Sequence, residues 1–148
     1  MQKRRGISPV IATVIIVAVT IAVAIAVAFW MTGIVGLFTS AEKLEIVSLY
    51  AVPRQGGGWQ INMTVKNTGT TTTSIDEIFI NGVPHTGCNN VNFPNLPIPL
   101  NPGNQTNIGI TINQNARCGT TTFTAGGSVE VKLHTTGGKE YPKLTVLP

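Results

Sequence analysis

The feature that most constrains this chain is an apolar segment near its start, with no charged residue between positions 7 and 40. It directly follows a basic triplet at positions 3–5. A helix needs about 20 apolar residues to cross the hydrocarbon core of a bilayer. A helix over Pro9–Thr39 would be about 45 Å long, since each residue adds about 1.5 Å. We therefore expect a hydrophobic transmembrane helix over residues 7–41.

Local signals at both ends of the segment fit a helix. Ser8 is expected to cap the N-terminus, and Pro9 suits the first turn, where a missing N–H costs nothing. Gly33 and Gly36 lie near the other end and favour either a bend or a simple helix exit. Val and Ile are frequent in the segment. They suit a helix in lipid, where every backbone hydrogen bond must close within the helix.

The charge distribution predicts the orientation of this helix. The basic triplet should stay on the cytoplasmic side, which places everything after Ser40 outside the cell. The segment then acts as a permanent anchor, or as a cleaved secretory signal with Ala-x-Ala sites between Ala22 and Ala28. Against cleavage there, the apolar run continues through Phe29 and Trp30, so a secreted product would keep an apolar tail.

A third interpretation comes from the residues around the change from basic to apolar. The run Arg5-Gly6-Ile7-Ser8-Pro9-Val10-Ile11-Ala12 resembles the N-terminal family of archaeal type IV pilins. The resemblance covers about residues 3–40 and implies a class III signal peptide over residues 1–6. A prepilin peptidase would cut between Gly6 and Ile7 on the cytoplasmic side. Ile11 stands where bacterial type IV pilins carry a glutamate, which favours the archaeal branch.

The same resemblance implies an assembly and a set of partners. Copies of the chain would polymerise through their helices into a helical homopolymer, with β heads on the outside. The implied partners are a prepilin peptidase, an assembly ATPase, a membrane platform protein and the membrane before assembly. The run Val65-Lys66-Asn67-Thr68-Gly69 also looks like the family's first strand-to-turn passage.

Small residues on the helix suggest how copies would approach one another. A helix that is apolar on every side needs cover on every face, from lipid before assembly and from sibling helices afterwards. Ala18, Ala22 and Ala26 repeat at four-residue spacing and would let helices come close. The alternative is that small residues are simply common in any membrane helix.

The remainder of the chain, residues 42–148, has the alternating pattern of β-strands. Apolar and polar residues alternate through six short runs separated by Gly- and Asn-rich turn signals. The expected strands are 44–52, 59–65, 74–80, 108–112, 129–133 and 141–147. With no second helix, this pattern predicts an antiparallel β-sandwich of Ig-like size, and hence an α+β chain.

Two cysteines lie in the predicted extracellular part. Residues 84–104 are rich in Pro and Asn and are expected to form a long irregular loop that contains Cys88. Cys118 lies well beyond this loop. In an oxidising compartment the two favour one disulfide, and the alternative is two reduced thiols.

Two sequons predict N-glycosylation sites. Asn62-Met63-Thr64 lies in an expected strand with Asn62 on its polar face, and Asn104-Gln105-Thr106 lies in the long loop. Both asparagines would be accessible to a glycosyltransferase. The alternative is chance, because Asn and Thr are abundant in the chain.

The remaining polar residues do not form a recognisable chemical site. Four side chains could in principle bind a metal: His85, Cys88, Cys118 and His134. Their spacing matches no strong ligand signature, so no metal site is expected. Asp76 and Glu77 are expected to be a solvated turn face rather than a catalytic pair. We expect neither enzymatic activity nor a cofactor.

The charge of +4 does not indicate nucleic-acid binding, because three of the ten Lys and Arg residues are in the N-terminal triplet. Without residues 1–6 the chain is nearly neutral and has no basic cluster to follow phosphates. The combined prediction is a structural subunit of an extracellular archaeal type IV pilus that serves in adhesion. The alternatives are an archaellin of a swimming filament and a membrane-anchored extracellular β-sandwich binding protein.

Overall fold

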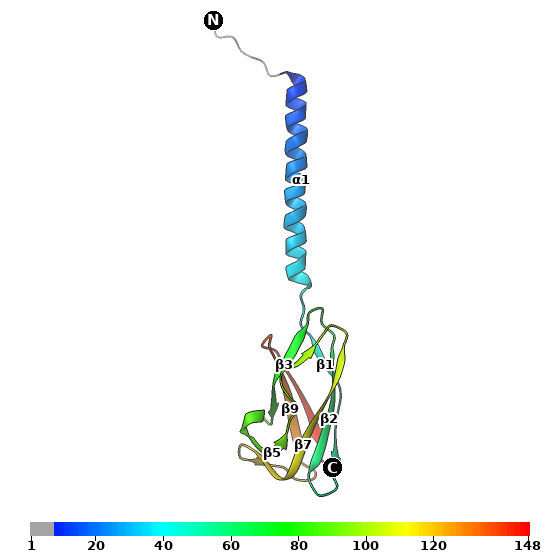
Figure 1. The fold of residues 1–148 in the computed structure, drawn as a ribbon, viewed down its shortest axis with the longest axis vertical. Coiled ribbons are helices and arrows are strands. Elements are labelled where there is room, and N and C mark those ends of the chain that lie inside the picture. Colours follow the sequence, from blue (N-terminus) through cyan, green and yellow to red (C-terminus); the bar gives the residue numbers. More distant parts are fainter. Residues whose placement is uncertain (1–7) are drawn as a thin grey trace. The chain divides into compact units, whose positions relative to one another are not determined.

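The computed structural model describes residues 8–148, apart from the side chains of residues 37–39. Within that range the chain has one long α-helix followed by ten strands and one short 3-10 helix (Figure 1). The chain divides into two compact units, one through Ser40 and one over Ala41–Pro148. An N-terminal helix followed by an antiparallel β head was predicted, and this α+β fold is confirmed. The predicted segment 1–6 and the Gly6–Ile7 junction lie outside the described residues.

Helix α1 spans Pro9–Thr39, the range expected from the apolar run. Pro9 occupies the first turn as predicted, but Ser8 makes no side-chain capping hydrogen bond, so that expectation was wrong. Instead the carbonyl oxygen of Ser8 accepts hydrogen bonds from the backbone N–H groups of Ile11 and Ala12, at 3.0 and 3.2 Å. The backbone therefore starts the helix without help from the hydroxyl.

The β unit consists of two antiparallel sheets. Sheet A has the order β1 (Leu44–Pro53), β2 (Trp59–Asn67), β7 (Gln105–Cys118) and β5 (Cys88–Asn92), and β8 (Thr121–Thr122) also pairs with β7. Sheet B has the order β10 (Glu140–Val146), β9 (Ser128–Thr135), β3 (Thr73–Ile80) and β4 (Val83–Pro84), and β6 (Ile98–Leu100) also pairs with β3. The six predicted strands correspond to β1, β2, β3, β7, β9 and β10.

One apolar core lies between the two sheets, as the alternating pattern predicted. Every second side chain of the central strands is buried in this core, and the side chains between them face outward. The fully buried members include Ile61, Met63 and Val65 of β2, Ile108, Ile110 and Ile112 of β7, and Val131 and Leu133 of β9. Each such side chain contributes about 1.5–3 kcal/mol relative to exposure.

The two sheets meet along one side, where β1 and β10 lie next to each other. Lysines of the β10 side cover carbonyl groups of the β1 side. Lys143 Nζ donates to the Ile46 carbonyl at 2.7 Å, and Lys139 Nζ donates to the Glu42 carbonyl at 2.7 Å. These contacts satisfy acceptors that an edge strand would otherwise leave open.

The predicted irregular loop over residues 84–104 is instead largely structured. It contains the end of β4, the 3-10 helix η1 (His85–Gly87), and strands β5 and β6. Strand β5 pairs with β7 at the edge of sheet A, with an irregularity between Asn89 and Val91. Asn90, which sits at this irregularity, has a positive φ of 59°. Backbone pairing at an edge does not require apolar side chains. The Asn-rich sequence of β5 therefore lacks the alternating pattern from which a strand is predicted.

Candidate functional site

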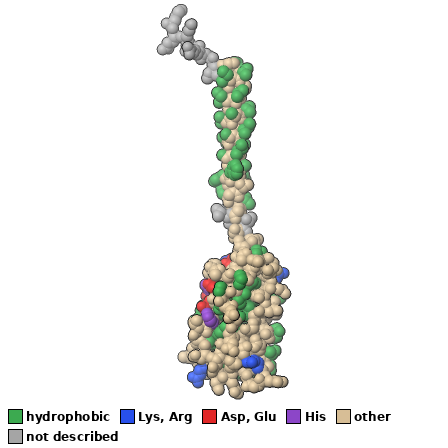
Figure 2. Space-filling model, viewed as in Figure 1, with side chains coloured by type: hydrophobic (Ala, Val, Ile, Leu, Met, Phe, Trp, Pro, Cys, Tyr) green, Lys and Arg blue, Asp and Glu red, His purple; other side chains and the backbone are tan. Residues whose placement is uncertain are grey.

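The surface of α1 is apolar along the length of the helix. Mean hydropathy over Pro9–Gly36 is 3.1, so the helix is long and apolar enough to cross a membrane. Large apolar side chains are exposed along its length (Figure 2). Phe29 and Trp30, for example, are 75% and 68% exposed. These side chains surround the helix instead of forming one stripe, so no single partner face would cover them.

Polar groups within α1 are satisfied locally. The hydroxyls of Thr13, Thr20 and Thr32 donate to the carbonyls of Val10, Val17 and Phe29, at 2.8, 2.8 and 3.0 Å. Each bond spans three residues of the same helix. A hydroxyl paired in this way does not need water, so it can enter lipid or a packed helix bundle at little cost.

Small residues shape the surface of α1. Ala18, one of the three predicted packing alanines, lies in a hollow of the helix surface together with Thr13, Val14, Val17 and Ile21. A second hollow is lined by Ile25, Ala28, Phe29 and Thr32. Ala22 and Ala26 are exposed on the helix but line neither of these hollows. Such hollows can receive side chains of a neighbouring helix, and the packing role of the three alanines stays a prediction.

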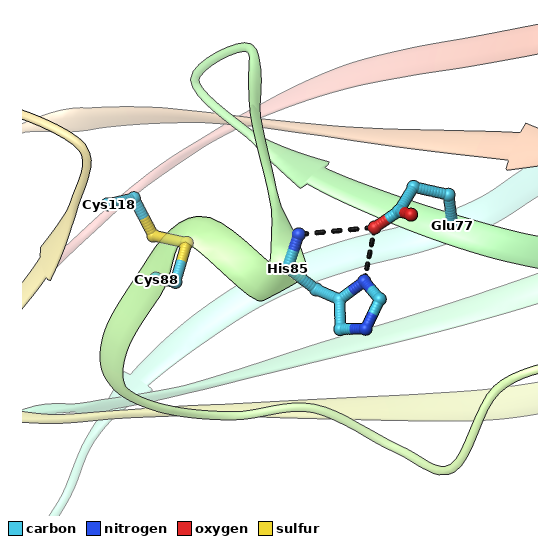
Figure 3. The surroundings of a disulfide bond; sticks show 4 residues. All are labelled: Glu77, His85, Cys88 and Cys118. Atoms are coloured by element: carbon cyan, nitrogen blue, oxygen red, sulfur yellow. Dashed lines mark hydrogen bonds and ion pairs between the residues drawn. A yellow bond between two sulfur atoms is a disulfide. The ribbon is translucent and has the colours of Figure 1, made fainter.

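The predicted disulfide joins the edge of sheet A to its central part. Cys88 at the start of β5 is bonded to Cys118 at the end of β7, with their Cα atoms 4.0 Å apart (Figure 3). The bridge closes a loop with a sequence separation of 30. In the chain-entropy model it stabilises the fold by about 3 to 4 kcal/mol. Cys118 is fully buried, so the bond also belongs to the core.

Two imidazole–carboxylate pairs use the consecutive residues Asp76 and Glu77 of β3, one with His134 of β9 and one with His85 of η1. His85 Nδ1 contacts Glu77 Oε1, which also accepts a hydrogen bond from the His85 backbone N–H at 3.3 Å (Figure 3). His134 Nδ1 lies 2.7 Å from Asp76 Oδ1. We had expected Asp76 and Glu77 to form a solvated turn face, and this expectation was wrong. They lie within β3, where a register shift lets consecutive carboxylates reach different histidines.

These pairs do not converge on a metal site. Among the described residues, no group of three His, Cys, Asp or Glu side chains is arranged to hold a metal ion. The two cysteines are bonded to each other, and each histidine is engaged by a single carboxylate. The four residues considered as ligands are thus used in separate structural contacts.

The two sequons occupy different settings. Asn62 lies in the middle of β2, half-exposed on the outer face of sheet A. Asn104 is exposed and directly precedes β7. The Asn104 carbonyl accepts a hydrogen bond from the Asn67 backbone N–H at 2.9 Å. Both asparagines are accessible in the folded β unit, and their modification stays a prediction.

Comparisons with known proteins give fold likenesses only. No family model matches the sequence, and no curated protein matches it. One similar solved structure is the archaeal flagellum of Methanospirillum hungatei strain JF1, with a TM-score of 0.51, 19% identity, and coverage of 93% of this chain and 88% of that chain. The match extends beyond the β unit, since 93% is more than residues 41–148 can supply.

A second similar structure is the apo PCuAC domain from PmoF1, with a TM-score of 0.50 and 11% identity. It covers 73% of this chain and 98% of that chain. At these identities the two likenesses establish the fold and leave the function open.

Proposed function

We propose that this chain is the subunit of an extracellular helical filament of the archaeal type IV class. The observation that carries the proposal is α1, which is apolar on every side and precedes a disulfide-bonded β-sandwich. Covering such a helix is favoured in water by tens of kcal/mol, at roughly 25 cal/mol per Å², before the costs of ordering and association. Lipid covers it before assembly, and α1 helices of other copies cover it afterwards.

The assembly route follows from the N-terminal residues. The basic triplet holds the start of the chain in the cytoplasm, and a prepilin peptidase cuts between Gly6 and Ile7. An assembly ATPase and a membrane platform protein then transfer the mature chain from the membrane into the filament. Both the resemblance of residues 5–12 to archaeal pilins and the fold likeness to an archaeal flagellum support this route.

Within this class we propose an adhesive pilus, on the strength of the Ser8-Pro9 start of the helix. The second candidate is an archaellin of a swimming filament, which the fold likeness to the Methanospirillum hungatei flagellum favours. A deletion strain separates the two. Loss of surface attachment with normal swimming supports the pilus, and loss of swimming with normal attachment supports the archaellin.

The experiment that tests the filament proposal is mass spectrometry of material sheared from the cell surface. A filament subunit is expected in the sheared fraction with its N-terminus at Ile7. A membrane-anchored binding protein, the candidate from a different class, would keep residues 1–6 and remain with the membranes. Recovery of the chain only in membranes, with residues 1–6 intact, would overturn the proposal.

A further inference from the structure

The outer face of sheet A carries a polar hollow of about 190 Å³. Two neighbouring cross-strand rows form it. The first row is Tyr50, Asn62 and Gly109, which lie opposite one another on β1, β2 and β7. The second row contributes Thr64 and Asn107. The strands therefore hold five side-chain positions around one depression, on the face opposite the core.

The depression lies where Gly109, the β7 member of the first row, has no side chain. A Cβ at this position would meet only the flexible end of Gln60 within 4 Å, with Nε2 at 3.0 Å. Tyr50 stands at the other end of the row and is 53% exposed. An exposed aromatic ring thus shares a row with a glycine whose outer face is approached only by the end of the Gln60 side chain.

The lining has the chemistry of a sugar site. Its outward side chains are two amides, one hydroxyl and one phenol, and none of its lining residues is charged. Amides and hydroxyls exchange hydrogen bonds with sugar hydroxyls, and an exposed aromatic ring packs against the apolar face of a sugar. The hollow is smaller than the roughly 300–1,000 Å³ of sites for drug-sized ligands, so it suits a single ring.

A sequon coincides with this hollow, since Asn62 and Thr64 both line it. Thr64 Oγ1 donates to Asn107 Oδ1 at 2.9 Å, while the Asn62 side chain makes no hydrogen bond with the residues that the structure describes. We propose that Asn62 carries an N-linked glycan whose first sugar lies in the hollow against Tyr50. The proposal goes beyond filament formation and does not depend on it.

The covalent step is redox-neutral. The Asn62 Nδ2 atom forms a bond to the anomeric carbon of a sugar held on a lipid-linked phosphate donor. The bond between that carbon and the phosphate oxygen breaks, the lipid phosphate leaves, and Nδ2 gives up one proton to a base of the transferase.

Asn104 provides a matched comparison, because it has a sequon but is not in the hollow. Trypsin separates the two sites. Asn62 falls in the peptide of residues 55–66, and Asn104 falls in the peptide of residues 67–117. The protein is isolated from its own cells, from filaments or membranes alike, so failure to form filaments does not affect the result.

The first test is mass spectrometry of these peptides. A glycan mass on the peptide of residues 55–66, lost in Asn62→Gln and in Thr64→Ala but kept in Asn104→Gln, is the expected result. An unmodified Asn62 peptide would overturn the proposal. If soluble N-acetylhexosamine instead perturbs Tyr50 resonances of the unmodified chain in micelles, the sugar is a bound ligand and the covalent assignment is wrong.

The second test is a double-mutant cycle between Tyr50 and the glycan. In the glycosylated chain Tyr50→Ala is expected to lower Tm by about 4 °C more than it does in the Asn62→Gln background. Tyr50→Phe keeps the ring and should show little of this difference. Gly109→Val displaces the end of Gln60 in both backgrounds but fills the hollow, so it should destabilise the glycosylated chain more than the Asn62→Gln chain. Equal shifts in both backgrounds would show that the glycan does not lie in the hollow.

Discussion

The side chain of Asn67 connects the end of β2 to β6 of the opposite sheet, since its Nδ2 atom donates to the Leu100 carbonyl at 3.0 Å. The same Nδ2 donates to the Thr71 carbonyl, and Oδ1 accepts from the Gly69 backbone N–H, both at 2.9 Å. Asn67 is fully buried. One amide therefore holds together the turn that follows β2 and a strand of sheet B.

The first prediction concerns this amide. Asn67→Leu removes the side-chain donor from the buried Leu100 carbonyl and the part-buried Thr71 carbonyl, and each such group costs about 1–3 kcal/mol. The Gly69 N–H keeps its bond to the Lys43 carbonyl. We expect a loss of about 3 kcal/mol or more in the free energy of unfolding, measured by denaturation of the full mature chain in detergent. Asn101→Ala is the control, because Asn101 is exposed and accepts only from Thr72 among the described side chains. Equal losses would contradict the role given to Asn67.

The second prediction concerns the disulfide. Replacing both Cys88 and Cys118 by alanine removes the constraint on the unfolded chain and should lower stability by about 3 to 4 kcal/mol. Thermal unfolding of the full chain, with and without a reductant, measures the loss. The wild-type chain should lose stability on reduction, and the double variant should not respond. If the reductant also destabilises the double variant, its effect on the wild-type chain does not come from the Cys88–Cys118 bond.

The third prediction concerns the hollow around Ala18. In a packed bundle, Ala18→Phe should clash with a neighbouring helix at a cost of about 1–3 kcal/mol at each contact, repeated in every subunit. The variant should still insert into membranes but form few filaments, as counted by negative-stain electron microscopy. Ile16→Leu conserves volume on the same helix and should assemble normally. Normal filaments from Ala18→Phe would exclude this surface from the packing.

The fourth prediction concerns processing. Gly6→Leu places a bulky residue at the proposed cleavage site and should leave residues 1–6 on the chain. The retained cations would then have to enter an apolar bundle, so filaments should be absent from the sheared fraction. Immunoblotting of membrane and sheared fractions measures this outcome. Filaments built from an uncleaved chain would contradict the proposed route.

Much of the fold could be predicted from periodicity. The charge-free run located α1, and strict alternation located β2, β7 and β9, because one face of each strand packs on the core. Strands β5 and β6 could not be found in this way. They pair through the backbone in a segment rich in Asn and Pro, where the side chains carry no alternating signal.

The candidate sites depend on register, which the sequence does not display. Asp76 and Glu77 meet two histidines only because β3 shifts register opposite β9 and because η1 positions His85. The hollow at Asn62 likewise requires Tyr50 and Gly109 to lie in the same cross-strand row. The sequons could be found in the sequence. The residues that surround them in the fold could not, because they come from distant strands whose register was unknown.

The central claim is that α1 exchanges lipid for the same helix of other copies. A cryo-EM reconstruction of filaments sheared from the cell surface tests it most directly. The account predicts a filament of this chain in which α1 helices pack in an axial bundle, with residues 9–36 covered and Ala18 against a neighbouring helix. A filament of this chain whose α1 side chains remain exposed to solvent would contradict it, as would sheared filaments that lack the chain.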